Sequence, residues 1–271
     1  MRLASMTPAE MAAQQREQGV AIATHNLTFS YPDSPEVLRD ISLEIRAGER
    51  VGIIGHNGCG KTTLFMLLCG VIAPSSGEIF LFGRPVVPGQ FRPEIGLLFQ
   101  DPDDQLFSAS VRDDIGFGPQ NMGLSPEEIE MRVQAALEMT GTEALADRPP
   151  HHLSGGEKQM VAIAGLLAMT PQVMLYDEPT ASLDLRTRRR LIHFLQQSPE
   201  TMLISSHDLE FVLEVCDRTL LVDDSCIIAD GQPAEVMGNQ ELMEKHGLEK
   251  PHSLIPHVED HHRPRDSFEG L

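Results

Sequence analysis

Hydrophobic and polar positions alternate in the first part of the chain in patterns typical of strands. Residues 21–31 (AIATHNLTFSY) predict a strand, and a turn follows at 32–35, where two prolines flank an aspartate and a serine. Residues 41–45 (ISLEI) alternate and predict a half-buried strand, whereas the apolar run 50–54 (RVGII) predicts a short buried one. A glycine-rich loop then leads into a helical stretch at 62–70, which ends in a glycine.

The second part of the chain alternates between helical and extended patterns. From 101 to 150 the composition becomes acidic, and residues 125–141 have helical periodicity behind a Ser-Pro-Glu-Glu start. This segment predicts a small helical subdomain inserted between strands. The other predicted elements are strands at 78–83, 95–100, 173–177 and 201–206, and helices at 155–169, 186–197 and 208–216. Such alternation indicates an α/β fold built on a mostly parallel sheet.

The length, net charge and hydrophobic content of the chain exclude several classes of protein. A length of 271 residues is enough for one large domain or two small ones with a substantial core. The net charge of −19 repels both phosphate backbones and anionic lipid heads, so nucleic-acid binding and direct adsorption to a membrane are not expected. A hydrophobic content of 41% with 23% charged residues is that of a folded globular chain.

Cysteine usage and hydropathy indicate a cytoplasmic protein. The four cysteines form no C-x-x-C pair and are too few for a disulfide scaffold. The longest apolar run, about 161–169, is half the length of a membrane span, and no signal peptide is recognisable. We expect a flexible tail at 1–19, a main domain at 20–250 with a helical subdomain at about 101–170, and a weakly ordered, His-rich tail at 251–271.

The sequence Gly55-His56-Asn57-Gly58-Cys59-Gly60-Lys61-Thr62 fits the pattern G-x-x-x-x-G-K-[ST] between a predicted strand and a predicted helix. In that context glycines let backbone N–H groups face phosphate oxygens, and the helix N-terminus adds a favourable dipole. We expect Lys61 to reach the β- and γ-phosphates and Thr62 to ligate Mg²⁺. The alternative is a chance glycine-rich turn. We also expect Cys59, beside Lys61, to favour its thiolate form.

Two adjacent carboxylates end the apolar run VMLYDE. Because ligands bind at the carboxyl ends of buried parallel strands, Asp177 is predicted to hold Mg²⁺, and Glu178 to polarise the attacking water. The alternative is that both acids cap a turn before a proline.

A second glycine-containing helix start is Leu153-Ser154-Gly155-Gly156-Glu157. Ser154 with Glu157 three residues later has the spacing of a capping box, which explains the serine without any ligand. The two glycines weaken a first helical turn, and their exposed N–H groups suit contact with a phosphate.

Together and in this order, these motifs resemble the nucleotide-binding domain of ABC ATPases, and the resemblance spans about 20–247. It implies a central mostly parallel sheet, an antiparallel β subdomain and a helical subdomain. It implies catalytic roles for Glu178, His207 (the switch histidine) and Lys61, and Mg²⁺ ligation by Thr62, Gln100 and Asp177. The implied ATP-binding residues are Tyr31, which would stack on adenine, Gly55, His56, Asn57, Gly58, Cys59, Gly60, Lys61, Thr62, Thr63 and Gln100 of the Q-loop.

The same resemblance implies partners. Two such chains, as a homodimer in our expectation, would sandwich ATP, so that the signature 153–157 and the D-loop residues Ser182 and Asp184 serve the partner's nucleotide. Having no span of its own, the chain would act at the cytoplasmic face of the membrane through a transmembrane coupling subunit and a substrate-binding membrane subunit.

One stretch indicates the subfamily. Residues 97–107 (LLFQDPDDQLF) resemble the Q-loop region of energy-coupling factor ATPases, which drive micronutrient uptake. The five histidines that we group as a His-rich tail favour a cobalt or nickel importer, and the alternative is a solvated, disordered tail: His246, His252, His257, His261 and His262. A vitamin importer, a soluble ATPase of nucleic-acid metabolism and a catalytically inactive regulatory partner are the alternatives, the last opposed by the presence of all catalytic groups.

Overall fold

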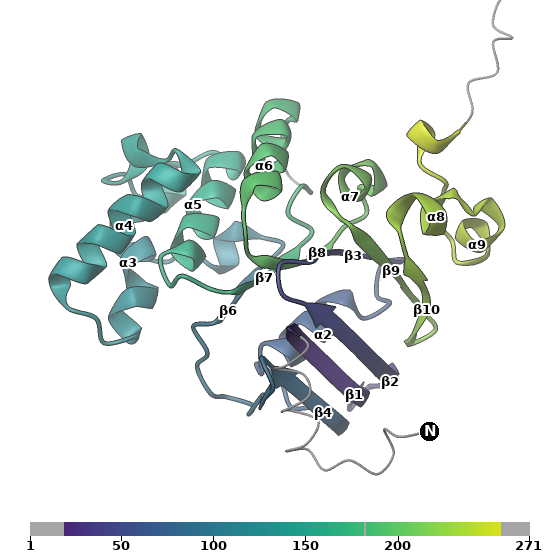
Figure 1. Cartoon of the computed structure of the whole chain (residues 1–271). Coiled ribbons are helices and arrows are strands. Elements are labelled where there is room, and N and C mark those ends of the chain that lie inside the picture. Colours follow the sequence, from purple (N-terminus) through teal and green to yellow (C-terminus); the bar gives the residue numbers. More distant parts are fainter. Residues whose placement is uncertain (1–18, 182, 256–271) are drawn as a thin grey trace, which may run out of the picture.

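A computed structural model describes residues 19–181 and 183–255 of the chain. Its centre is a six-stranded sheet (Figure 1). In spatial order the strands are β10 (Cys226–Gly231), β9 (Arg218–Asp223), β3 (Arg50–Ile54), β8 (Thr201–Ser205), β7 (Val173–Asp177) and β6 (Ile95–Leu98). All neighbours run parallel except β10, which forms an antiparallel hairpin with β9. The prediction of a mostly parallel central sheet is confirmed.

A second, antiparallel sheet lies beside it. Its order is β2 (Ser34–Arg46), β1 (Val20–Tyr31), β4 (Ser76–Leu81) and β5 (Arg84–Pro85). The strand expected at 41–45 is much longer, because its pairing with β1 continues through several register shifts as far as the Tyr31–Ser34 pair. The connecting turn therefore consists of residues 32–33, two residues shorter than predicted.

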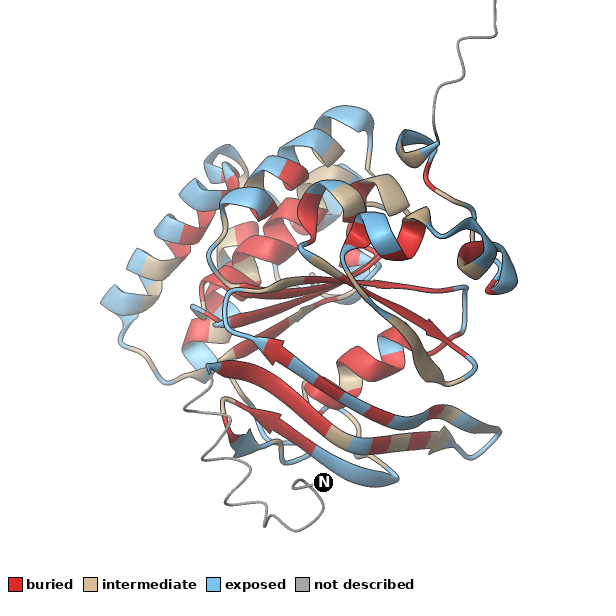
Figure 2. Cartoon of the chain, turned by 45° about the vertical axis from the view of Figure 1, so that its right-hand side comes forward, coloured by how far each residue is buried: buried red, intermediate tan, exposed pale blue. Residues whose placement is uncertain are grey.

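Helices cover both faces of the central sheet (Figures 1 and 2). Helix α2 (Lys61–Leu68) lies between the two sheets, and its leucines and Phe65 join the apolar side chains of both in one core cluster. On the other face a second cluster gathers residues of α5 (Gly155–Leu167), α6 (Leu185–Gln197) and α7 (Leu209–Val215). The carboxyl edge of the parallel strands is left open between these layers.

The helical subdomain has a small apolar cluster of its own, built by α5 with α3 (Val111–Asn121) and α4 (Pro126–Thr140). Helix α4 begins where predicted, with Ser125 and Glu128 forming a capping box. Helix α3 was not predicted, since its sequence VRDDIGFGPQN has two glycines and an internal proline. Short 3-10 turns occur at Pro102–Asp104, Glu143–Leu145, Pro150–His152 and His252–Leu254.

The C-terminal part returns to the central sheet. Helices α8 (Pro233–Gly238) and α9 (Gln240–Lys245) follow β10, and at 251–255 Pro251 is buried and Ser253 hydrogen-bonds Glu210 of α7. The rest of the two predicted tails, 1–18 and 256–271, lies outside the described residues. Within the described part of the chain, every helix is too short or too polar to cross a membrane.

Candidate functional site

A cavity of about 380 Å³ opens at the carboxyl edge of the central sheet, where the loops after β3, β6, β7 and β8 meet. Most of the predicted ATP-site residues line it. The lining consists of Tyr31, Val37, Asn57, Gly58, Gly60, Lys61, Thr62, Thr63, Gln100, Asp177, Glu178 and His207. Ligands bind at this edge in open α/β sheets.

The phosphate loop has a backbone that requires its glycines. Gly58 and Gly60 have φ angles of 82° and 104°, in the region that favours glycine. A Cβ on Gly60 would also lie 2.9 Å from Leu38 and 3.1 Å from the carbonyl oxygen of Val37. Helix α2 starts directly after this loop, and no side chain of the described residues caps it. Its first N–H groups are therefore available to an anion in the cavity.

Lys61 is buried at the base of this loop. Its ammonium donates to the carbonyl oxygens of Gly55, at 2.9 Å, and His56, at 3.2 Å. A buried ammonium needs such partners, and these two are backbone carbonyls of the loop itself. The side chain of His56 turns away from the cavity to Asp223, and neither Gly55, His56 nor Cys59 lines the cavity wall.

Three side chains whose oxygen atoms could bind a metal ion converge beside Lys61. The Thr62 hydroxyl donates to the Asp177 carboxylate, with 2.6 Å between the oxygens, and Gln100 lines the same wall. Ser205, opposite Asp177 in the parallel pairing of β7 with β8, donates to the other carboxylate oxygen. Hydroxyl, carboxylate and amide oxygens suit Mg²⁺, which prefers oxygen ligands and keeps several waters.

Glu178 is held in an uncommon backbone conformation, with φ at 48°. Its N–H donates to the carbonyl and hydroxyl oxygens of Ser205, and its Oε2 accepts from the N–H of His207. The His207 ring nitrogen lies 3.1 Å from Oε1, yet its direction makes no hydrogen bond, so Oε1 is buried without a donor among the described residues. Such strain and an unsatisfied carboxylate oxygen are typical of a reactive position.

Tyr31 lies at the mouth of the cavity. Its hydroxyl is 3.3 Å from that of Thr63, and its ring packs edge-on against Phe29 with 4.7 Å between centroids. Tyr31 is 37% exposed, so part of the residue is accessible to a ligand in the cavity.

Two expectations about titratable side chains are wrong. Burial raises the pKa of the Cys59 thiol and outweighs the nearby Lys61 ammonium, so the thiolate is not favoured. His246, counted with the His-rich tail, is buried in the folded domain and bonded to Asp223. Of the other tail histidines, 257, 261 and 262 lie outside the described residues.

The signature segment lies elsewhere. Ser154 caps α5 and forms the capping box with Glu157, as the spacing predicted, and the signature residues 153–157 do not line the cavity. Packing explains why the second of the two glycines lacks a side chain. A Cβ on Gly156 would lie 2.8 Å from Thr187. Asp184 caps α6 by accepting from the N–H groups of Arg186 and Thr187, while Ser182 lies outside the described residues.

Sequence reasoning missed two supporting residues, Ser205 and Asp223. Ser205 lies within a predicted strand and is the last residue of β8, and its position opposite Asp177 depends on which strands are neighbours. Asp223 ends a strand, β9, that the pattern did not predict. Both would have been found by asking which polar residues end each strand of the parallel sheet.

Comparison with known proteins identifies the family. The family model described as ABC transporter matches residues 38–181. A putative ABC transporter ATP-binding protein of Synechocystis is 60% identical over 86% of this chain and 82% of its own length. The energy-coupling factor transporter ATP-binding protein EcfA of Methanothermobacter thermautotrophicus is 43% identical over 85% of this chain and 76% of its own.

Solved structures give the same result. The structure of cbiO1 from Clostridium perfringens, part of the ABC transporter complex cbiONQ, matches with a TM-score of 0.74 and 39% identity over 84% of this chain and 94% of that one. A dimeric ATP-binding cassette in a post-hydrolysis state with ADP and phosphate matches with a TM-score of 0.70 and 26% identity, over 78% and 98% of the two chains. The chain therefore belongs to the ATP-hydrolysing, ATP-binding subunits of ABC transporters, and within them to the energy-coupling factor type.

Proposed function

We propose that this chain hydrolyses ATP in the cavity at the phosphate loop and thereby powers the import of a micronutrient, cobalt or nickel ions, through separate membrane subunits. The observation that carries the proposal is the convergence of Lys61, Asp177 and Glu178 on one cavity beside an uncapped helix N-terminus. Charge on a triphosphate is stabilised by such an arrangement of cation, backbone N–H groups and metal ligands.

ATP enters with its phosphates against the loop 55–62. Lys61 exchanges its two carbonyl partners for β- and γ-phosphate oxygens, which makes its hydrogen bonds stronger because both partners are charged. Asn57, Gly58, Gly60 and Thr63 face the same phosphates, and the ring of Tyr31 stacks on adenine.

Thr62, Gln100 and Asp177 are the residues that would hold Mg²⁺. When bound, Mg²⁺ neutralises charge that develops on the phosphate oxygens. Ser205 keeps Asp177 oriented towards Thr62, so the donor set is preorganised before nucleotide arrives.

Glu178 acts as the general base. Among the described residues no group hydrogen-bonds its Oε1, which can therefore accept a proton from water, while Oε2 is fixed by the backbone N–H of His207. The His207 ring, 41% exposed beside Oε1, is within reach of a γ-phosphate in the cavity. These roles assign Lys61, Glu178 and His207 to catalysis.

A second copy of the chain completes the site. The signature 153–157 does not line this chain's own cavity, and a head-to-tail homodimer brings the signature and the D-loop residue Asp184 of one copy to the nucleotide of the other. The dimeric ATP-binding cassette with ADP and phosphate supports this arrangement.

A transmembrane subunit docks on the helical subdomain. There a cavity of about 530 Å³ is lined mainly by apolar side chains, among them Phe91, Phe107 and Phe117, which are 54%, 67% and 48% exposed. The segment from Gln100 to Phe107 lines the ATP cavity at one end and this groove at the other. A helix pressed into the groove is thereby coupled to the metal ligand Gln100, and the chain is held peripherally at the cytoplasmic face.

The docking groove is tested by Phe107→Asp combined with Phe117→Asp in the tagged full chain. We expect loss of the copurifying membrane subunits with unchanged Mg-ATP affinity, because the groove and the ATP cavity have separate linings. Met131→Asp, an equally exposed apolar position on α4, is the matched control. Retention of the membrane subunits by the double variant would contradict the docking site.

The proposal that cobalt or nickel ions are transported is supported by two similarities. Residues 97–107 resemble energy-coupling factor ATPases, and the chain is similar to cbiO1. The purified complex in liposomes should take up Co²⁺ or Ni²⁺ when Mg-ATP is supplied on the ATPase side, and Glu178→Gln should abolish uptake. Uptake of a vitamin with no response to either ion would replace the metal by the vitamin class. ATPase activity stimulated by nucleic acid would overturn the transport function.

A further inference from the structure

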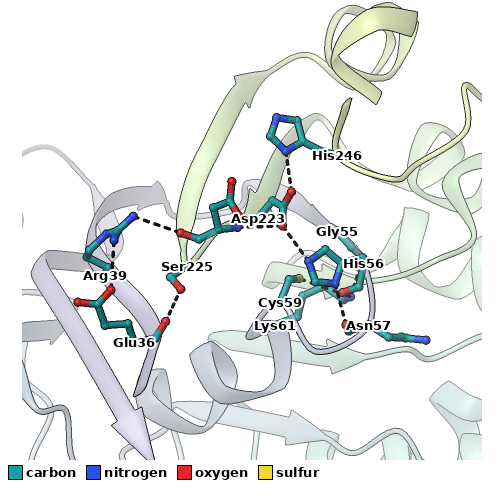
Figure 3. A network of polar contacts seen from close by, with 11 residues as sticks. Glu36, Arg39, Gly55, His56, Asn57, Cys59, Lys61, Asp223, Ser225 and His246 are labelled. Atoms are coloured by element: carbon teal, nitrogen blue, oxygen red, sulfur yellow. Dashed lines mark hydrogen bonds and ion pairs between the residues drawn. The ribbon is translucent and has the colours of Figure 1, made fainter. Parts of the chain in front are cut away.

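Asp223, the last residue of β9, contacts two histidines that are far apart in the sequence (Figure 3). Its Oδ1 is 2.8 Å from Nε2 of His56 in the phosphate loop, and its Oδ2 is 2.6 Å from Nδ1 of His246, which follows α9. Asp223 and His246 are 9% and 7% exposed. One buried carboxylate therefore connects the C-terminal helix to the phosphate loop.

The His56 ring is held at both of its nitrogens. Nδ1 of His56 is 2.7 Å from the carbonyl oxygen of Asn57, and Nε2 is 2.8 Å from Oδ1 of Asp223. These two contacts fix the orientation of the ring. Burial alone would raise the pKa of Asp223, but hydrogen bonds from His246, the Asp224 N–H and His56 outweigh it and hold that pKa below its ordinary value.

The backbone of His56 in turn holds the catalytic lysine. Its carbonyl oxygen accepts from the Lys61 ammonium at 3.2 Å and from the N–H of Cys59 at 3.3 Å. A Cβ on the preceding Gly55 would lie 2.2 Å from the carbonyl oxygen of Val222, so loop and β9 are in direct backbone contact. A side chain that anchors His56 to Asp223 consequently anchors the residue that orients Lys61.

The turn that carries Asp223 is itself held in place. Asp224 and Ser225 have φ angles of 46° and 66°, and the Asp224 N–H donates to the Asp223 carboxylate at 2.8 Å. The N–H of Arg39 in β2 donates to the carbonyl oxygen of Ser225 at 2.7 Å, and the Ser225 hydroxyl donates to the carbonyl oxygen of Glu36. These contacts fix the turn and with it the position of the Asp223 carboxylate. The contact with His246 then fixes the orientation of Oδ2.

We propose that Asp223 and His246 are positioning residues for ATP binding: His246 orients Asp223, Asp223 holds the His56 ring, and this contact holds the phosphate loop around Lys61. The inference rests on the proposed use of that loop to bind ATP. It makes the C-terminal helix α9, distant in sequence, a structural part of the ATP site.

The test is His246→Leu in the full chain. We expect the Kd and KM for Mg-ATP to rise about tenfold, or ~1.4 kcal/mol, with kcat unchanged within about twofold. Neither Asp223 nor His246 lines the ATP cavity, so we expect their loss to weaken ATP binding and to leave the chemical step unchanged. His246→Asn should restore affinity, because its amide nitrogen lies near the position of Nδ1. The matched control is His193→Leu on the exposed side of α6.

Asp223→Asn is a second variant, which removes the charge at constant shape and should raise KM in the same way. If His246→Leu does not fold, as judged by thermal unfolding, the Asp223→Asn result decides. Unchanged KM in folded variants, or a fall in kcat alone, overturns the positioning role while leaving the ATP site intact. If the wild type itself binds no Mg-ATP, the proposed ATP site fails, and the inference fails with it.

Discussion

The N-termini of α2, which follows the phosphate loop, and of α5, which begins within the signature, both lie in glycine-containing segments, yet they are built differently. The phosphate loop uses left-handed glycines, Gly58 and Gly60, and leaves the start of α2 without a side-chain cap. The signature helix is capped by Ser154, which exchanges hydrogen bonds with Glu157.

Under the proposed function, this difference reflects where each segment would contact a phosphate group. The start of α2 faces a cavity within the same chain and stays open because its ligand arrives there. The start of α5 does not line that cavity, and the capping box of Ser154 and Glu157 satisfies donors at this helix end within the chain, which stabilises the helix in a single copy. In the proposed dimer, the same serine and N–H groups must exchange their internal partners for the nucleotide of the second copy.

The largest effect is expected for a substitution at the ATP cavity that slows hydrolysis but leaves ATP binding intact. Glu178→Gln keeps the size of the side chain but removes the general base, so hydrolysis should fall by about 10²–10⁴-fold. Mg-ATP affinity should persist because Lys61 and Thr62 are unchanged, and size-exclusion chromatography with Mg-ATP should show a stable dimer. Asp177→Asn should instead weaken binding as well, since it alters the metal ligands. Hydrolysis at the wild-type rate in Glu178→Gln would place the base elsewhere.

An intermediate effect is expected on the signature side. Ser154→Ala should lower hydrolysis roughly 10- to 100-fold, the value of a hydrogen bond to a charged group, without lowering the Mg-ATP affinity of the single chain. The lost cap should also reduce the free energy of unfolding by about 0.5–2 kcal/mol. Ser125→Ala, the same change in the capping box of α4, controls for stability alone. Equal loss of hydrolysis in both variants would remove the functional role of Ser154.

The smallest effect is a pH dependence confined to the capped helix. Hydrogen bonds from the Ser154 hydroxyl and N–H hold the pKa of Glu157 below its ordinary value in the folded chain. The folded state then binds this proton less readily than the unfolded state, so the contribution to stability is present above about pH 4.3 and is lost as pH falls through the folded pKa. NMR titration should show the Glu157 pKa rising in Ser154→Ala. An unchanged pKa would mean that the capping box does not persist in solution.

The strand and helix around the phosphate loop, and the acids that end β7, could be predicted from local pattern alone, whereas α3 and β9 could not. A glycine-rich loop between an apolar strand and a helix, and two acids at the end of a buried strand, are short contiguous signals whose geometry follows from backbone conformation. The start of α4 was equally predictable, because a capping box is made within four residues.

Contacts between distant segments needed the tertiary structure. The pairing of Ser205 with Asp177 depends on β8 lying beside β7, and the fit of Gly156 against Thr187 depends on how α5 meets α6. Composition groups His246 with a polar, His-rich tail, yet folding buries it against Asp223. The hydrophobic pattern of a segment indicates which local conformation that segment favours. Contacts between residues far apart along the chain depend instead on how the sheets and helices pack together.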